Sequence, residues 1–216
     1  MESKSRYAAL YFYIPKKDGS LQLVQDYRKL NQVTIKDKTV LPLIGEVIDK
    51  LKEVKYFNKL DLIWGYNNVW IQEGDKWKAA FLINKGLFKP QVMYFRLYNL
   101  PGTFQRMMNS IFWELFHEEV LANYINDFVI PARTMEELKE RTIQFLKIAE
   151  KYNLCFKWSK CNFNMEEIPI LGVVVGKRQV KMEQEKIKAV KDWKTPTKIK
   201  DVESFLEFAN VYWRFI

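Results

Sequence analysis

The sequence contains few of the side chains that most often bind transition metals, with two cysteines and one histidine among 216 residues. Cys155 and Cys161 have no paired cluster of Cys or His around them, so we expect no zinc site and two reduced thiols. A single histidine, His117, excludes a histidine-based catalytic triad. No apolar run approaches the roughly 18 to 20 residues that span a bilayer, and the charged first residues do not resemble a signal peptide. We therefore expect a soluble, intracellular protein with no membrane partner.

The composition is that of a folded and basic domain. Hydrophobic residues make up 48% of the chain and aromatic residues 15%, which is enough for a sizeable core in one domain with subdomains. The 35 Lys and Arg residues exceed the 26 Asp and Glu residues, giving a net charge of +9. This charge suits a partner with a phosphate backbone. A solvated, lysine-rich surface is the open alternative.

Strand and helix signals alternate along the chain, without internal repeats or low-complexity runs. Asp18-Gly19 between two apolar runs indicates a hairpin, and Pro42 suits the start of an amphipathic helix. The expected strands are 11–13, 21–24, 57–62, 77–83, 87–95, 120–122, 128–130 and 163–176, and the expected helices are 42–54, 101–119, 135–152, 184–193 and 198–215. This mixture predicts an α+β fold in which an antiparallel sheet packs on helices.

Two of the strand-like runs end in acidic side chains. Asp61 ends one run, and Tyr124-Ile125-Asn126-Asp127 forms the tip of a predicted hairpin. A purely structural turn is one reading, because Asn and Asp tolerate the left-handed backbone of two-residue hairpin turns. Two strands that each deliver a carboxylate to one point also create a site for divalent cations that bridge phosphates. We therefore expect Asp61, Asn126 and Asp127 to lie together.

Further sequence blocks accompany these two acidic segments. They are Val24–Asn31, Lys59–Leu62, Trp64–Asn68, Trp77–Phe81, Pro101–Gln105, the Tyr124 turn and Leu171-Gly172. With these blocks in this order, the chain resembles, nearly from end to end, the reverse transcriptase domain of gypsy-like long-terminal-repeat retrotransposons, particularly fungal ones. In that family the turn reads Tyr-x-Asp-Asp, so Asn126 occupies the place of a catalytic aspartate.

The resemblance implies a polymerase palm-and-fingers fold that continues into the start of a thumb. The fingers would comprise about residues 1–58 and 79–100, the palm about 59–78 and 101–182, and the start of the thumb about 183–216. It also implies RNA-directed DNA polymerase activity with two Mg²⁺ ions as cofactors. The implied partners are an RNA or DNA template with a primer and deoxynucleoside triphosphates, and the oligomeric state stays open.

Roles for individual residues also follow from the resemblance. Asp61 and the backbone carbonyl of Leu62 would bind the metal ions, with Asp127 as the second acid of the turn. Tyr66 would pack against the sugar and exclude a 2′ hydroxyl; without the family, Asp61 reads as a strand-end residue and Tyr66 as a core aromatic. The other implied contacts are Lys16 with the nucleotide phosphates, Arg28 and Gln105 with the template and nucleotide, Lys160 as a proton donor to pyrophosphate, and Leu171-Gly172 with the primer.

Three departures from the family pattern affect this same site. Asn126 offers an amide oxygen where the family has a carboxylate, and an amide is the poorer ligand for magnesium. Gln22 replaces an arginine that binds the phosphates of the incoming nucleotide. Arg96 replaces a glycine beside the nucleotide pocket, where the backbone packs closely and a long side chain should intrude. Together these changes predict weak or absent synthesis.

All three departures fit single C-to-T or G-to-A transitions, as do Leu23, Trp70, Ile83, Leu100, Glu207 and Trp213. We therefore interpret the chain as a transposon copy damaged by cytosine deamination. Two functional readings stay open, a working RNA-directed DNA polymerase and a catalytically dead relic that folds and still binds nucleic acid. A third, an unrelated nucleic-acid-binding module, would require the ordered blocks to be coincidental.

Overall fold

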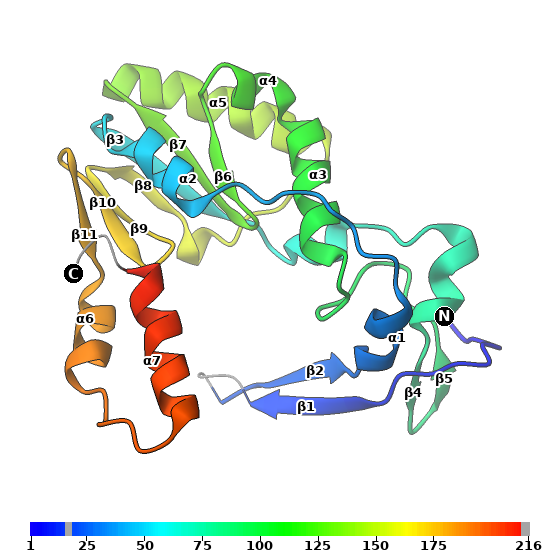
Figure 1. The fold of residues 1–216 in the computed structure, drawn as a ribbon. Coiled ribbons are helices and arrows are strands. Elements are labelled where there is room, and N and C mark those ends of the chain that lie inside the picture. The colour runs from blue at the N-terminus through cyan, green and yellow to red at the C-terminus, as the bar shows by residue number, and fades with distance from the viewer. Residues whose placement is uncertain (16–18, 213–216) are drawn as a thin grey trace.

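Helices alternate with mainly antiparallel strands along the chain, so the α+β prediction is confirmed. The computed structural model describes residues 1–15 and 19–212. Its elements (Figure 1) are β1 (Tyr11–Pro15), β2 (Leu21–Gln25), α1 (Arg28–Val33), α2 (Ile44–Leu51), β3 (Tyr56–Asp61), η1 (Gly65–Asn68), η2 (Glu73–Ala79), β4 (Phe81–Ile83), β5 (Gly86–Phe88), α3 (Leu100–Ile111), α4 (Trp113–His117), β6 (Ala122–Tyr124), β7 (Asp127–Ala132), α5 (Met135–Lys151), η3 (Trp158–Lys160), β8 (Asn162–Met165), β9 (Glu167–Ile170), β10 (Val173–Gly176), β11 (Gln179–Met182), α6 (Gln184–Lys191) and α7 (Ile199–Val211).

The central sheet is antiparallel, has the strand order β6-β7-β3-β8, and is buried on both faces. Because side chains alternate along a strand, β3 and β7 contribute to two separate cores. Leu60 and Phe128 lie in the core that includes α3 and α5, whereas Phe57 and Val129 lie in the core that includes α2 and the second sheet, β9-β10-β11. All four of these side chains are fully buried. A strand with two buried faces is held firmly in place.

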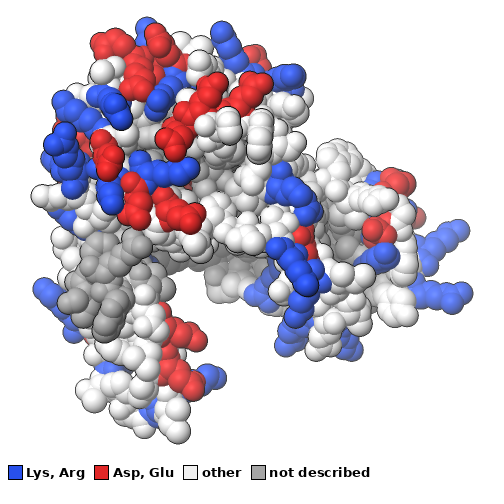
Figure 2. Space-filling model, turned by 45° about the horizontal axis from the view of Figure 1, so that its top comes forward, with Lys and Arg blue, Asp and Glu red and all other residues white. Residues whose placement is uncertain are grey.

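Two lobes extend from the central sheet (Figure 1). The hairpins β1–β2 and β4–β5 and helix α1 form one lobe, and α6 and α7 form the other. Figure 2 shows an open recess between the lobes, with the basic side chains prominent on the hairpin lobe and both signs of charge mixed on the central part. Within the described residues, no helix has the length and apolar character needed to cross a membrane.

Several predicted elements are confirmed by the structure. β1 and β2 pair as the hairpin expected around Asp18-Gly19, although residues 16–18, and with them Lys16, lie outside the described residues. α5 begins where predicted, with the Thr134 side chain accepting a hydrogen bond from the Glu137 N–H as an N-terminal cap. α6 and α7 correspond to the two C-terminal helices, of which residues 213–215 are not described.

Other predicted elements are wrong in extent because of tertiary packing and turn geometry. The helix expected over 101–119 is interrupted at Phe112, whose backbone leaves the helical range (φ −108°, ψ 25°) while its ring is buried. The strand expected over 163–176 is three strands, since Leu171 (φ 52°) and Gly172 (φ 84°) form a tight turn between β9 and β10. Residues 77–79 belong to the 3₁₀ helix η2, the strand expected over 87–95 ends at Phe88, and Pro42 precedes α2.

Phe145 offers a test of the core beneath the central sheet. Its ring is fully buried and stacks on Phe112 at a centroid distance of 4.8 Å. We expect Phe145→Ala to lower the free energy of unfolding by about 3 to 5 kcal/mol, because it removes buried apolar surface and leaves a cavity. Urea denaturation followed by circular dichroism measures this change. The matched control is Phe163→Ala at an exposed position, and an equal loss in both variants would contradict the assignment of the core.

Candidate active site at the end of the central sheet

Asp61 and Asp127 lie opposite each other on neighbouring strands, so the predicted meeting of the two acids is confirmed. In the antiparallel register of β3 and β7, Asp61 is the last residue of β3 and pairs with Asp127, the first residue of β7. Their side chains are 25% and 32% exposed, respectively. Asn126 directly precedes Asp127, and its carbonyl oxygen accepts a hydrogen bond of 3.4 Å from the Leu62 N–H. The three residues therefore occupy one end of the sheet and face solvent in part.

Each of the two carboxylates has a lysine beside it. Lys59 Nζ lies 3.2 Å from Asp127 Oδ1, and Lys160 Nζ lies 3.6 Å from Asp61 Oδ2. The Lys160 side chain is 58% exposed and free to move, whereas that of Lys59 is only 17% exposed. These ammonium groups offset the two negative charges. Sequence reasoning identified Lys160 but missed Lys59, which appeared only as part of a family block.

The turn that carries Asn126 and Asp127 is strained at Ile125. Tyr124 pairs with Asp127, so Ile125 and Asn126 are the two central residues, and only Ile125 has a positive φ, at 56°. That pattern belongs to a type II′ turn, which favours glycine at the first central position. A β-branched side chain is unusual in this conformation. The sequence-based reasoning assigned the left-handed backbone to the Asn and Asp residues, and that assignment is wrong.

Two buried amide side chains hold the strained turn in place. The Ile125 N–H donates to Gln105 Oε1 at 3.2 Å, and the Ile125 carbonyl accepts from Asn123 Nδ2 at 2.6 Å. Gln105 Nε2 in turn donates to Asn123 Oδ1 at 2.6 Å. Gln105 is 1% exposed, so its part in any template contact would be exerted through the turn. The signal for Asn123 was a polar residue within an apolar strand, and it was overlooked.

Asn126 directs its side chain away from solvent. Its Oδ1 atom is buried and lacks a hydrogen-bond partner among the described residues. A β-carbon added to Gly65 would lie 2.2 Å from this oxygen, so the amide packs directly on the glycine backbone. The side chain of Asn126 thus occupies a space that only glycine at position 65 leaves open. A buried oxygen without a donor is costly, and it adds no accessible ligand to the two carboxylates.

Tyr66 lies next to this glycine and is half-buried. Its ring contacts Phe95 and Phe104 edge-on, with centroid distances of 5.4 Å in both cases. Burial raises the pKa of the Tyr66 hydroxyl, with a further contribution from Tyr124. The hydroxyl is therefore uncharged at neutral pH, and the ring forms an apolar wall beside the acidic residues.

Arg96 lies in the adjoining loop with a backbone conformation that favours glycine. Its φ is 74°, which is unfavourable for a residue with a β-carbon. The Arg96 carbonyl accepts a hydrogen bond of 2.7 Å from Asn31, and its guanidinium lies 5.2 Å from the centroid of the Phe12 ring in β1. The physical objection to arginine here is therefore the backbone conformation, and its side chain lies over the hairpin lobe.

Arg28 and Gln22 lie in the hairpin lobe. Arg28 forms two hydrogen bonds to the Asp26 carboxylate, of 2.9 and 2.6 Å, while 85% of its side chain stays exposed. Hydrogen bonding to Arg28 lowers the pKa of Asp26 to about 2. Gln22 is half-buried in β2 opposite Ile14. Lys16 belongs to the undescribed tip between β1 and β2.

Leu171 and Gly172 form the two-residue turn between β9 and β10. Both have positive φ, as expected for a type I′ turn. A β-carbon on Gly172 would lie 2.2 Å from the hydroxyl oxygen of Tyr212, so the residue that follows α7 packs directly against this turn. Burial raises the pKa of the Tyr212 hydroxyl, and Glu183 adds to the shift. Gly172 is therefore required both by its backbone and by this close approach.

The donor set at the end of β3 and β7 suits a hard divalent cation. Carboxylate oxygens are the ligands that Mg²⁺ prefers, and Asp61 and Asp127 present two carboxylates from adjacent strand ends. In the described part of the chain, no group of three or more His, Cys, Asp or Glu side chains is gathered at one point. With Asn126 turned toward Gly65, the site offers two carboxylates, each paired with a lysine.

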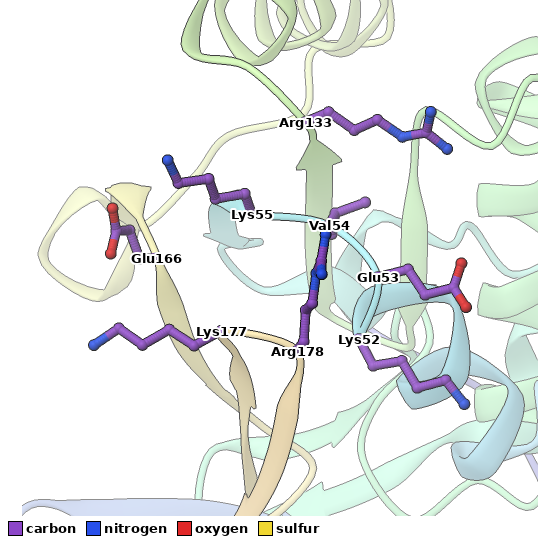
Figure 3. Close-up of a pocket in the computed structure, with 8 residues that line it drawn as sticks. All are labelled: Lys52, Glu53, Val54, Lys55, Arg133, Glu166, Lys177 and Arg178. Atoms are coloured by element: carbon purple, nitrogen blue, oxygen red, sulfur yellow. The ribbon is translucent and has the colours of Figure 1, made fainter.

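A separate hollow of about 990 Å³ lies at the opposite end of β3 and β7 (Figure 3). It is lined by Lys52, Glu53, Val54, Lys55, Arg133, Glu166, Lys177 and Arg178. In Figure 3, Lys55 and Lys177 point to one side and Lys52 and Arg133 to the other. The length of β3, roughly 17 Å at 3.4 Å per residue, separates this hollow from Asp61. Its charges belong to a different surface from the acidic site.

Comparison with known sequences identifies a family. The family model described as reverse transcriptase (RNA-dependent DNA polymerase) matches residues 14–175. The retrovirus-related Pol polyprotein from transposon 297 of Drosophila melanogaster is 35% identical over the whole chain, and the transposon Tf2-3 polyprotein of Schizosaccharomyces pombe is 30% identical. The chain spans 21% and 16% of the lengths of these two relatives.

Solved structures share the fold. The foamy viral protease-reverse transcriptase in complex with an RNA/DNA hybrid has a TM-score of 0.84 at 18% identity, covering 97% of this chain and 28% of that one. The dRH form of that protein in complex with double-stranded DNA has a TM-score of 0.89 at 19% identity, covering 97% of this chain and 37% of that one. At these identities the similarity concerns the fold alone.

The amide pair that holds Ile125 generates a stability prediction. We expect Gln105→Leu to lower the free energy of unfolding by about 1 to 3 kcal/mol, because the Ile125 N–H and the Asn123 amide lose their buried partners. Amide exchange at Ile125 should also accelerate relative to that of the rest of β6 and β7. Chemical denaturation and hydrogen exchange measure the two effects.

The matched control for Gln105→Leu is Asn109→Ala. Asn109 accepts a hydrogen bond from Gln105 but is exposed, so its loss should stay within about 0.5 kcal/mol. Equal exchange at Ile125 in Gln105→Leu and in the unmodified chain would show that the amide pair does not hold the turn.

Proposed function

Because the chain belongs to the reverse transcriptase (RNA-dependent DNA polymerase) family, we propose that it is the RNA-directed DNA polymerase domain of a retrotransposon polyprotein. Within that family we assign it to the gypsy-like long-terminal-repeat elements of fungal type, as a mutated copy whose synthesis is impaired. Its substrates would be a primer on an RNA or DNA template and deoxynucleoside triphosphates. The proposal is supported by the relatives, which are transposon polyproteins.

The pairing of Asp61 with Asp127 carries this proposal. Phosphoryl transfer to a primer 3′ oxygen requires groups that position the reactants and neutralise the developing charge. Asp61, Asp127 and the backbone carbonyl of Leu62 are the groups that would bind two Mg²⁺ ions, which supply that neutralisation when bound. Lys160, beside Asp61 and largely exposed, is placed to donate a proton to the leaving pyrophosphate.

The surrounding residues would bind the substrates. We assign Tyr66 to the sugar of the incoming nucleotide, since its ring forms an apolar wall close to the acidic turn. Arg28 and Lys16 would contact phosphates from the hairpin lobe, and Leu171-Gly172 would contact the primer. The division into fingers (about 1–58 and 79–100), palm (about 59–78 and 101–182) and the start of a thumb (about 183–216) belongs to the same proposal.

Three residues would impair this machinery in different ways. Asn126 supplies no carboxylate and buries its amide oxygen against Gly65. Gln22 cannot form the bidentate, permanently charged contact that arginine makes with phosphate. Arg96 holds a backbone conformation that favours glycine. These defects concern metal binding, phosphate binding and the shape of the pocket, so no single reversion should repair all of them.

A catalytically inactive domain that still binds nucleic acid is the second candidate function. It is favoured by the lysines beside both carboxylates, which already offset their charges in the structure. A site that is balanced in this way does not repel phosphates even when no cation is bound. Binding of a duplex would then persist without synthesis.

Reversion of the three departures tests the proposed function. Asn126→Asp alone should not restore normal synthesis, because the new carboxylate is added where the present side chain is buried beside Gly65, while Gln22 and Arg96 are unchanged. The triple variant Gln22→Arg, Arg96→Gly and Asn126→Asp should exceed the product of the single gains, since residues of one catalytic unit are not additive. Primer extension on an RNA template with magnesium measures all eight combinations.

The negative control for the reversion series is the triple variant with Asp127→Asn added, which should lose the recovered synthesis. Circular dichroism of every variant separates loss of fold from loss of chemistry. Robust synthesis by the unmodified chain, or full recovery from Asn126→Asp alone, would show that the three departures do not impair the site as proposed.

Salt dependence separates nucleic-acid binding from a merely charged surface. We expect the affinity for an RNA/DNA hybrid to fall steeply with salt, because bound cations are released when lysines neutralise phosphates. Replacing Lys16 and Lys17 together with Gln should reduce the slope of log affinity against log salt by about 2. Gel-shift titration measures the slope. The control pair is Lys139→Gln with Lys147→Gln on the exposed face of α5, and a slope that neither pair changes would contradict the assignment of phosphate contacts to the hairpin tip.

A further inference from the structure

Lys59 connects two parts of the molecule that have different roles in the proposed function. It lies in β3, two residues before Asp61, and only 17% of its side chain is exposed. Its ammonium group lies 3.2 Å from Asp127 Oδ1 and donates a hydrogen bond of 2.9 Å to the carbonyl oxygen of Pro169 in β9. One charged group therefore contacts the acidic turn and the second sheet at the same time.

The course of the chain places the Leu171-Gly172 turn at the same end of the molecule as the acids. Met165 in β8 pairs with Phe57 near the start of β3, and Pro169 in β9 is bonded to Lys59, which lies farther along β3. From β8 to β9 the chain thus reverses and runs toward the level of Asp61. The Leu171-Gly172 turn follows two residues after Pro169, and Figure 1 shows β9 and β10 beside β8.

No strand ladder joins the central sheet to β9-β10-β11 in the described part of the chain. The two sheets meet through apolar side chains, among them Phe57, Val129 and Ile168. Apolar packing is not directional, and by itself it permits small shifts of one sheet over the other. An ion pair combined with a charge-assisted hydrogen bond has a defined geometry, so the contacts of Lys59 fix the relative position of Asp127 and β9.

We propose that Lys59 is a positioning residue that couples the acidic turn to the β9–β10 hairpin and so holds a primer 3′ end at a fixed place beside Asp61 and Asp127. The proposal rests on the proposed function for the identity of the primer. The coupling itself is a property of this chain and is testable without synthesis. Lys160, the other lysine at the acids, has an exposed side chain and an ion pair to Asp61 alone, so it lacks the second contact.

Hydrogen exchange with Lys59→Met tests the coupling directly, because methionine keeps an apolar stem and removes the ammonium group. We expect exchange of the amides in residues 167–175 and 123–128 to accelerate together by about tenfold, as for the loss of a charge-assisted hydrogen bond from a local opening equilibrium. Lys59→Arg should restore slow exchange in both segments, since a guanidinium can reach two acceptors. The matched control is Lys181→Met, which removes an exposed lysine that pairs with Glu167 in the same second sheet.

A double-mutant cycle distinguishes the coupling from simple packing of the lysine stem. Asp127→Asn and Lys59→Met should each accelerate exchange in 167–175, and the double variant should be no faster than Lys59→Met alone, because both changes break one network. Independent, additive effects in that segment would overturn the proposal. Unchanged exchange in 167–175 with Lys59→Met would overturn it as well, because Lys59 would then only neutralise Asp127.

An RNA/DNA hybrid with 2-aminopurine at the primer 3′ end reports the functional consequence. Lys59→Met should change the fluorescence of the bound primer end, and Lys181→Met should leave it unchanged. If the unmodified chain fails to bind the hybrid, the proposed function fails while the exchange experiments still decide the coupling. If the hybrid binds and Lys59→Met leaves both the fluorescence and the exchange rates unchanged, the proposal for Lys59 fails while the proposed function stands.

Discussion

The register between β3 and β7 is the constraint on which the candidate site depends. Asp61 faces Asp127 only because Leu60 pairs with Phe128 and the ladder continues in step to the far end of the sheet. A slip by one residue would exchange the two faces of a strand, and here both faces are buried in separate cores. The apolar residues that stabilise the sheet therefore also fix the distance between the two carboxylates.

The strained turn shows how the interior stabilises a local conformation that its own sequence disfavours. A β-branched residue with positive φ costs on the order of 1 to 3 kcal/mol. Ile125 keeps this conformation because Gln105 and Asn123 satisfy its N–H and carbonyl groups away from water. Gln105 comes from α3, so the helix that forms one core also holds the turn. The acidic turn is thus positioned by a helix that carries neither of the paired acids.

Charge at the site is distributed differently from charge on the surface. The chain has a net charge of +9, yet the acidic pair is matched by Lys59 and Lys160, and Asn126 adds no charge to it. Attraction for a polyanion therefore comes from the basic surface, while the acidic end of the sheet is locally balanced. Affinity for nucleic acid and capacity for chemistry depend on separate residues, and mutation can remove the second while leaving the first.

The sequence by itself determined the α+β class, the hairpin β1–β2, the helix α5 with its cap, and the meeting of Asp61 with Asp127, because each is encoded in local patterns or in ordered family blocks. Tertiary structure decided the break at Phe112, the left-handed backbone at Ile125 and the contacts of Lys59. The physical reason is that these features arise between residues far apart in the chain. Gln105 and Ile125 are 20 positions apart, and Lys59 and Pro169 are 110 apart. Periodicity and turn preference report only on neighbours, so contacts at such separations become visible only in the folded chain.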